Sequence, residues 1–181
     1  MFTTLDGFVA GPNGEFDDYE PSREEHEFAN SLFGAADGVM FGRRTYEGFV
    51  EYWDALDLTD LSVPKAEIEF ARIFRKMKRV VFSRTLESAP ENTLLIQTDY
   101  ALQVNALKQQ PGQDLLLICG PELLATLLEH HLVDEYRIMV KPSAIGRGTA
   151  LFGEIGEKLR LNLVSTHVFQ SGAVMHHYRT A

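Results

Sequence analysis

The chain has 181 residues, 45 % of them hydrophobic, and a formal net charge of −9. This length and composition fit one globular domain over residues 1–181, and the negative charge excludes a general nucleic-acid-binding protein, which needs a basic face. Cys119 is the only cysteine, so an intramolecular disulfide is excluded and a reducing, cytoplasmic location is expected. Because no apolar run reaches the ~18 residues that cross a bilayer, we expect no membrane partner.

The chain begins with the features of a short strand, a loop and a helix. Apolar residues up to Ala10 predict the strand. Residues 11–18 are rich in turn formers and predict a loop, which acts either as a lid or as a plain surface turn. Ser22 and Glu25 then form a capping-box pattern, which predicts the start of a helix whose apolar face packs on the sheet.

The next feature is the junction at Gly42, where an apolar strand ends and a helix begins with Arg43, Arg44 and Thr45. A helix N-terminus offers unpaired N–H groups and the positive end of its dipole, and guanidinium groups match phosphate oxygens. The junction therefore suits a phosphate group, although arginines at this position can also be ordinary solvated surface residues.

Two further strand ends have the same character. One apolar run stops at Ser83 and Arg84, and another runs through Cys119 into Gly120 and Pro121, where proline favours a first helical turn. Turn chemistry explains each of these ends separately. Because ligands bind at the carboxyl ends of strands in open α/β sheets, the three ends together predict a nucleotide site.

The remaining elements complete an α/β pattern. Phe49 and Trp53 lie on the helix after Thr45, where they either join the core or line a substrate pocket. The next helix opens at Pro64 and ends in a basic run (Arg72, Arg75, Lys76, Lys78 and Arg79), which we expect to be solvated and to complement the helix dipole. Thr98 is the expected cap of the helix that follows.

The last helix follows Gly120 and should end near His131, and residues 134–140 alternate as a strand. Residues 159–169 and 173–178 flank a short loop containing Gly172, which predicts a β-hairpin. Neither His130–His131 nor His176–His177 has the spacing of metal ligands, so we expect no metal site. Cys119 is interpreted as a small apolar residue that ends a buried strand.

The chain resembles the dihydrofolate reductase superfamily, and more closely the branch similar to the C-terminal reductase domain of the bifunctional protein of bacterial riboflavin biosynthesis. The matching segments, in order, are residues 5–11, 42–47, 81–84, 118–120 and 145–152. The resemblance implies a dihydrofolate-reductase-like three-layer α/β fold, with a mostly parallel central sheet, an antiparallel C-terminal hairpin and flanking helices. It also implies a homodimer.

The same resemblance implies an NADPH-dependent reductase that transfers hydride to a diaminopyrimidine or pteridine, similar to 5-amino-6-(5-phosphoribosylamino)uracil reductase. The cofactor-binding residues that it implies are Ala10, Gly42, Arg43, Arg44, Thr45, Ser83, Arg84, Cys119, Gly120, Pro121, Glu122 and Leu123. Glu24, Phe49 and Trp53 are the candidate substrate contacts.

Asp6 is the one carboxylate considered as a proton donor, but its place before Gly7 favours a turn, so no catalytic residue is named. Two alternatives remain open. One is a non-catalytic nucleotide- or ligand-binding homo-oligomer with the same fold, and the other is a true dihydrofolate reductase, which would need a carboxylate of the helix after Ser22 at the pterin site.

Overall fold

The computed structural model describes residues 1–15 and 19–181, and these form two compact units. The continuous unit contains Pro21–Cys119, whereas the split unit combines Met1–Glu20 with Gly120–Ala181. The expected lid, residues 11–18, falls partly outside the described residues, because residues 16–18 are not among them. None of the helices in the described part of the chain is long and apolar enough to cross a membrane.

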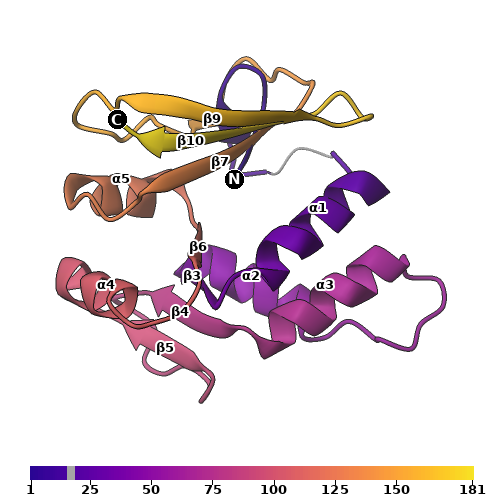
Figure 1. The fold of residues 1–181 in the computed structure, drawn as a ribbon, viewed down its shortest axis with the longest axis horizontal. Coiled ribbons are helices and arrows are strands. Elements are labelled where there is room, and N and C mark those ends of the chain that lie inside the picture. Colours follow the sequence, from indigo (N-terminus) through magenta and orange to yellow (C-terminus); the bar gives the residue numbers. More distant parts are fainter. Residues whose placement is uncertain (16–18) are drawn as a thin grey trace. The chain divides into compact units, whose positions relative to one another are not determined.

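A parallel four-stranded sheet forms the centre of the continuous unit (Figure 1). Its strand order is β5-β4-β3-β6, with β3 at Gly38–Gly42, β4 at Lys78–Phe82, β5 at Thr93–Ile96 and β6 at Leu115–Ile118. The sequence analysis predicted β3, β4 and β6, but it missed β5, which is a four-residue strand at the sheet edge.

Helices cover both faces of this sheet. The helices are α1 (Arg23–Gly34), α2 (Arg43–Trp53), α3 (Lys65–Lys76) and α4 (Tyr100–Lys108). Side chains alternate across a strand, so Phe41 and Val81 face the aromatic core built with α1, α2 and α3. Phe82 points to the opposite face, where the centroid of its ring lies 5.1 Å from that of Tyr100 of α4. The continuous unit thus has the expected layers of helix, sheet and helix.

The predicted capping box of α1 is confirmed. Ser22 accepts a hydrogen bond from the Glu25 amide, and the Glu25 carboxylate accepts one from the Ser22 amide at 2.7 Å. The apolar face of α1 packs mainly on α3. There Phe33 contacts Phe70 edge to face, with 4.7 Å between the ring centroids. The helix therefore reaches the core through α3 as well as through the sheet.

The capping prediction for α4 is wrong. Its N-cap is Asp99, which has a left-handed backbone conformation (φ 53°) and no side-chain cap hydrogen bond. The Thr98 hydroxyl instead donates to the Asp99 carboxylate at 3.1 Å, so it does not cap the helix amides.

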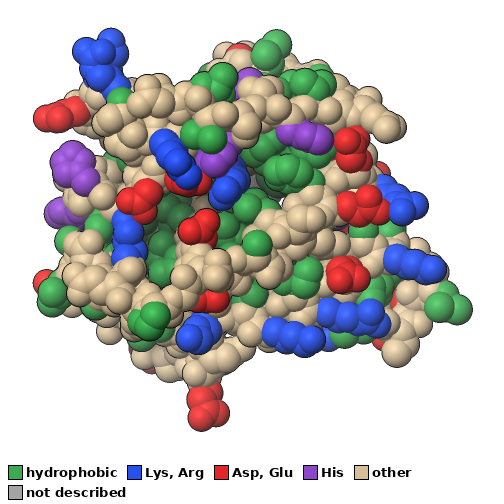
Figure 2. Space-filling view, in the orientation of Figure 1, with side chains coloured by type: hydrophobic (Ala, Val, Ile, Leu, Met, Phe, Trp, Pro, Cys, Tyr) green, Lys and Arg blue, Asp and Glu red, His purple; other side chains and the backbone are tan. Residues whose placement is uncertain are grey.

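The basic run at the end of α3 is solvated only in part. Arg72, Lys76 and Lys78 are exposed, and Figure 2 shows Lys and Arg side chains on the surface over α3. Arg79 is buried, which contradicts the expectation of a solvated side chain. The sequence could not show this, because the partner of Arg79 is Asp54, which lies 25 residues earlier.

The split unit contains a mixed sheet with the order β1-β7-β10-β9. Its strands are β1 (Phe2–Thr3), β7 (Glu135–Val140), β10 (Val174–Thr180) and β9 (Leu161–Val168). β1 and β7 pair in parallel, and β7, β10 and β9 pair antiparallel. The predicted C-terminal hairpin is thus confirmed, with Gly172 at φ 87° in its turn.

Three smaller elements complete the split unit. Helix α5 spans Pro121–Glu129, and its C-cap is His130, close to the predicted end. β2 (Phe8–Ala10) pairs with β8 (Thr149–Ala150), a pairing that the sequence analysis did not predict. A side chain at Gly148 would collide with the carbonyl oxygen of Ala10, so only glycine permits this approach of the two segments.

Candidate functional site

The carboxyl ends of β4, β3 and β6 lie next to one another in the continuous unit. β3 pairs with β4 so that Gly42 stands opposite Phe82, and it pairs with β6 so that Phe41 stands opposite Ile118. All three strands are parallel, so Ser83 and Cys119 follow their strands at the same edge as Gly42. The geometry that the sequence analysis expected for a nucleotide site is present at this edge.

The N-terminus of α2 lies at this edge and is suited to an anion. Gly42 is its N-cap and has no side chain to cap the first amides, and the first turn contains no acidic residue. Arg43 donates to both carboxylate oxygens of Glu47, at 3.1 and 3.2 Å. The Arg44 side chain is exposed and makes no hydrogen bond or ion pair within the described part of the chain. Uncapped amides and an available guanidinium are the groups that bind phosphate.

Ser83 is buried and already makes hydrogen bonds in the turn that follows β4. Its hydroxyl oxygen accepts from the amides of Leu86 at 2.9 Å and Thr85 at 3.2 Å. These bonds leave the hydroxyl proton as the group that Ser83 can donate to a ligand. Arg84, next to it, is exposed and has no hydrogen-bond or ion-pair partner among the residues described.

Cys119 ends the continuous unit as a small buried residue. Burial raises the pKa of its thiol to about 12, so the side chain is protonated at neutral pH. This protonation state agrees with the interpretation of Cys119 as a structural residue rather than a nucleophile.

The other predicted cofactor residues belong to the split unit. Gly120 is the N-cap of α5, Pro121 occupies its first position, and Glu122 lies in its first turn. Leu123 follows on the same helix, and Ala10 is the last residue of β2. The structure therefore brings Gly42–Thr45, Ser83, Arg84 and Cys119 to one sheet edge, and it assigns Ala10 and residues 120–123 to a different unit.

A cavity of about 470 Å³ lies beside β2 within the split unit. Ala10 and Gly11 contribute to its lining, and so do two cations, Lys141 and Arg147. The sequence analysis did not single out either cation. Arg147 stands in the matching segment 145–152, which was the available signal, whereas Lys141 has no distinguishing pattern around it.

Asp6 forms the turn that the sequence analysis favoured. Its carboxylate accepts hydrogen bonds from the Thr4 hydroxyl at 2.6 Å, the Gly146 amide at 2.7 Å and the Ile145 amide at 3.1 Å. These hydrogen bonds lower the pKa of Asp6, and the bond from the Thr4 hydroxyl has the largest effect. A carboxylate held in its ionised form is a poor proton donor at neutral pH.

The candidate substrate residues have structural contacts of their own. The ring centroids of Phe49 and Phe41 lie 5.1 Å apart, and those of Trp53 and Phe70 lie 4.5 Å apart. Both Phe49 and Trp53 therefore take part in the aromatic core. Glu24 lies in the first turn of α1, and the adjacent Glu25 is buried in the capping box. Substrate contact by Glu24, Phe49 or Trp53 stays a prediction.

The histidines of the second pair, His176 and His177, contact other side chains. His177 Nε2 lies 2.6 Å from a Glu135 carboxylate oxygen, and His176 Nδ1 lies 3.4 Å from the Thr166 hydroxyl. Within residues 1–15 and 19–181, no three His, Cys, Asp or Glu side chains form a group able to hold a metal ion.

The sequence and fold of the chain are similar to those of known proteins. The chain is 32 % identical to "Uncharacterized protein YyaP" of Bacillus subtilis (strain 168) over 176 residues, which is 96 % of this chain and 89 % of the relative. Among solved structures, it is similar to a protein assigned to riboflavin biosynthesis from Shewanella sp. PV-4 (TM-score 0.75, 22 % identity, 100 % of this chain and 96 % of that one).

The chain is also similar in fold to the dihydrofolate reductase of Enterococcus faecalis complexed with NADP(H), with a TM-score of 0.65 and 14 % identity over 99 % of this chain and 92 % of that one. These similarities confirm the dihydrofolate-reductase-like fold. The family model described as the RibD C-terminal domain matches residues 1–175, and the chain therefore belongs to that family.

Proposed function

We propose that the protein is an NADPH-dependent reductase that transfers hydride to a small heterocycle of the riboflavin-pathway type, a diaminopyrimidine bearing a ribityl or ribosyl phosphate. The observation that carries the proposal is the edge where β3, β4 and β6 end in register, with the uncapped N-terminus of α2 among them. Membership in the RibD C-terminal domain family supports a reductase, and a structural relative with bound NADP(H) supports the cofactor.

The donor groups at this edge fit the phosphates of a dinucleotide. The first amides of α2 lack a side-chain cap, and Arg44 and Arg84 add two exposed cations. In the proposed site, Gly42–Thr45 hold the adenosine phosphates, with the Ser83 hydroxyl and Arg84 beside them. NADPH supplies the hydride when bound, and the protein positions it and the substrate.

No side chain of this chain is assigned as the proton donor. The Asp6 carboxylate is hydrogen-bonded and ionised, and the Cys119 thiol is buried. We propose that water or the substrate itself supplies the proton. A non-catalytic nucleotide-binding protein is the second candidate, and the hydrogen-bonded state of Asp6 is the observation that favours it.

We also propose that residues 1–181 act together as one domain in a cytoplasmic homodimer. β9 is the edge strand of its sheet, and every residue after Leu161 in this strand is exposed. Three of them are large and apolar: Leu163 is 59 % exposed, Val164 47 % and Val168 67 %. Soluble proteins rarely leave a long apolar edge uncovered, so a second copy of the chain is the proposed cover.

The proposal is tested by titrating the purified protein with NADPH in a calorimeter and then adding substrates. Phosphorylated aminopyrimidines, pteridines and dihydrofolate are tested for loss of the reduced-nicotinamide absorbance. Turnover of a phosphorylated aminopyrimidine supports the proposal, and turnover of dihydrofolate alone would establish the true dihydrofolate reductase instead. NADPH binding without turnover of any of these compounds would favour the non-catalytic alternative.

The matched control for these measurements is Arg23→Ala. Arg23 is exposed and forms an ion pair with Glu27 on α1, so its removal takes away one cation without touching the sheet edge. Arg84→Ala should weaken NADPH binding, whereas Arg23→Ala should leave it unchanged.

A further inference from the structure

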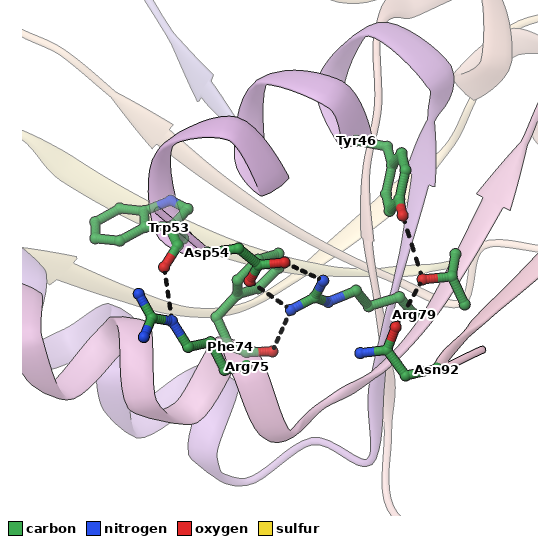
Figure 3. A network of polar contacts seen from close by, with 8 residues as sticks. Tyr46, Trp53, Asp54, Phe74, Arg75, Arg79 and Asn92 are labelled. Atoms are coloured by element: carbon green, nitrogen blue, oxygen red, sulfur yellow. Dashed lines mark hydrogen bonds and ion pairs between the residues drawn. The ribbon is translucent and has the colours of Figure 1, made fainter. Parts of the chain in front are cut away.

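Helix α2 is attached to the sheet at both of its ends. At its start, Gly42 joins it directly to β3. At its end, the Asp54 carboxylate accepts two hydrogen bonds from the Arg79 guanidinium of β4, at 2.7 and 2.8 Å (Figure 3). Arg79 stands opposite Val39 in the β3–β4 ladder, so strand, helix and ion pair form a closed loop of contacts.

A second arginine holds the same end of the helix. Arg75 Nε donates to the Trp53 carbonyl at 3.0 Å, and its guanidinium also donates to the Leu56 carbonyl at 2.6 Å. Two guanidinium groups thus lie at the C-terminal, negative end of the α2 dipole. Polar, directional contacts therefore fix this end of the helix.

The rest of the α2 interface is mainly aromatic. Phe49 contacts Phe41 and Phe74, and Trp53 contacts Phe70. Apolar contacts decide which face of a helix is buried, but they are not directional and tolerate small rotations and shifts along the axis. A bidentate arginine–carboxylate pair accepts only a narrow range of geometries.

The ion pair is not arranged for stability alone. The Arg79 side chain is only 3 % exposed, and its guanidinium stacks over the Phe74 ring at 4.3 Å. Its Nε is nevertheless buried, with no hydrogen-bond partner among the described residues. The Asp54 side chain, by contrast, is 34 % exposed, so water screens its attraction to Arg79 and the pair adds little stability. The two directional hydrogen bonds between Asp54 and Arg79 therefore point to a role in geometry.

The elements joined by this pair are the two that carry the predicted phosphate contacts. β4 leads from Arg79 to Ser83 and Arg84, and α2 leads from Asp54 back to Arg44 and Arg43. We propose that Asp54 and Arg79 are positioning residues, a brace that sets the rotation and axial position of α2 and so aligns its first turn with the end of β4. Their effect on the cofactor rests on the proposed function, because it requires that this turn binds NADPH.

The test replaces the pair by apolar side chains in the full chain, Asp54→Leu with Arg79→Met. We expect this double variant to keep a urea midpoint close to that of the wild type and to bind NADPH roughly 10- to 100-fold more weakly, as expected when reacting or binding groups shift by about 1 Å. The matched control is Arg23→Gln with Glu27→Gln, which removes an exposed ion pair with the same N···O distance of 2.7 Å. It should change neither quantity.

Hydrogen exchange gives a second readout that does not depend on NADPH. Amides of residues 47–50 should exchange faster in the double variant, and amides of α4 should keep wild-type rates. A purely structural role would loosen only the helix end near Trp53. Wild-type affinity together with wild-type exchange at residues 47–50 would overturn the brace.

Two outcomes separate this inference from the proposed function. If the wild type binds no NADPH, the proposed function fails, and the exchange rates at residues 47–50 alone decide whether the brace exists. If the double variant does not fold, Asp54→Asn takes its place, because it keeps the shape of the side chain and removes the charge. Unchanged NADPH affinity and unchanged exchange in a folded Asp54→Asn variant would also overturn the brace.

Discussion

Replacement of Arg44 or Arg84 by alanine should reduce the preference for NADPH over NADH. The 2′-phosphate of NADPH adds an acidic group that NADH lacks, and charge-assisted hydrogen bonds from arginine recognise it. Both side chains are exposed and neither has a hydrogen-bond or ion-pair partner among the described residues. No existing contact must therefore break before either arginine binds phosphate.

The size of the effect follows from the strength of one such bond. A hydrogen bond to a charged group contributes about 1.5–3 kcal/mol, which is roughly ten- to a hundredfold in Kd. Because water screens exposed charges, we expect the lower end of this range, about tenfold, for each single variant. Arg43→Ala should have a smaller effect, since the Arg43 guanidinium is already paired with Glu47 at 3.1 Å.

Calorimetric titration of NADPH and NADH against the wild type and the three variants measures these differences. NADH binding should stay nearly unchanged in Arg44→Ala and Arg84→Ala. Equal weakening of both cofactors would mean that the arginines contact the shared pyrophosphate or support the fold. No change for either cofactor would mean that the nucleotide site is elsewhere.

Four further predictions follow from described features. Light scattering at micromolar concentration should give a homodimer mass, and Val164→Lys on the edge strand β9 should shift it towards the monomer; a monomeric wild type would contradict this. Asp6→Asn should lower the Tm at neutral pH. Because hydrogen bonds depress the pKa of Asp6, their stabilisation is present above the unfolded pKa of ~3.9 and is lost as the pH falls through the lower folded value, so the difference in Tm should disappear in acid; a difference independent of pH would refute this. Cys119, whose pKa burial raises to about 12, should react with iodoacetamide only after unfolding, and rapid labelling of the native protein would show that the thiol is accessible. Finally, amides of residues 11–15 should exchange more slowly with NADPH and substrate bound than without them if the loop is a lid, and equal rates would make it a simple turn.

The sequence predicted the parallel strands and their shared edge because the signals are local. Apolar runs that stop at Gly42, Ser83 and Cys119 mark the ends of β3, β4 and β6, and the rule for parallel sheets then brings the ends together. The capping box of Ser22 and the hairpin around Gly172 were predictable for the same reason. All of these features depend on residues only a few positions apart.

The features that were missed depend on distant partners or on very short segments. Arg79 is buried because its guanidinium pairs with the Asp54 carboxylate, 25 residues away, and no spacing pattern in the sequence indicates that contact. The strand β8 has two residues, too few for a periodic pattern, and its approach to β2 depends on Gly148. Lys141 lines a cavity only because β7 and the segment around β2 come together in the fold.

In the sequence, the continuous unit stands between the two segments of the split unit, and this order has a consequence for synthesis on the ribosome. The continuous unit, Pro21–Cys119, contains all four strands of its sheet and can form once that stretch has emerged. β1 must wait for β7, because Phe2 pairs with Met139 and Thr3 with Val140, and the hairpin beside β7 is made last. Until then the first residues of the nascent chain remain without their partner strand, and closing so long a loop favours the early, local assembly of the inner unit. Native contacts at the N-terminus should therefore be among the last to appear during translation.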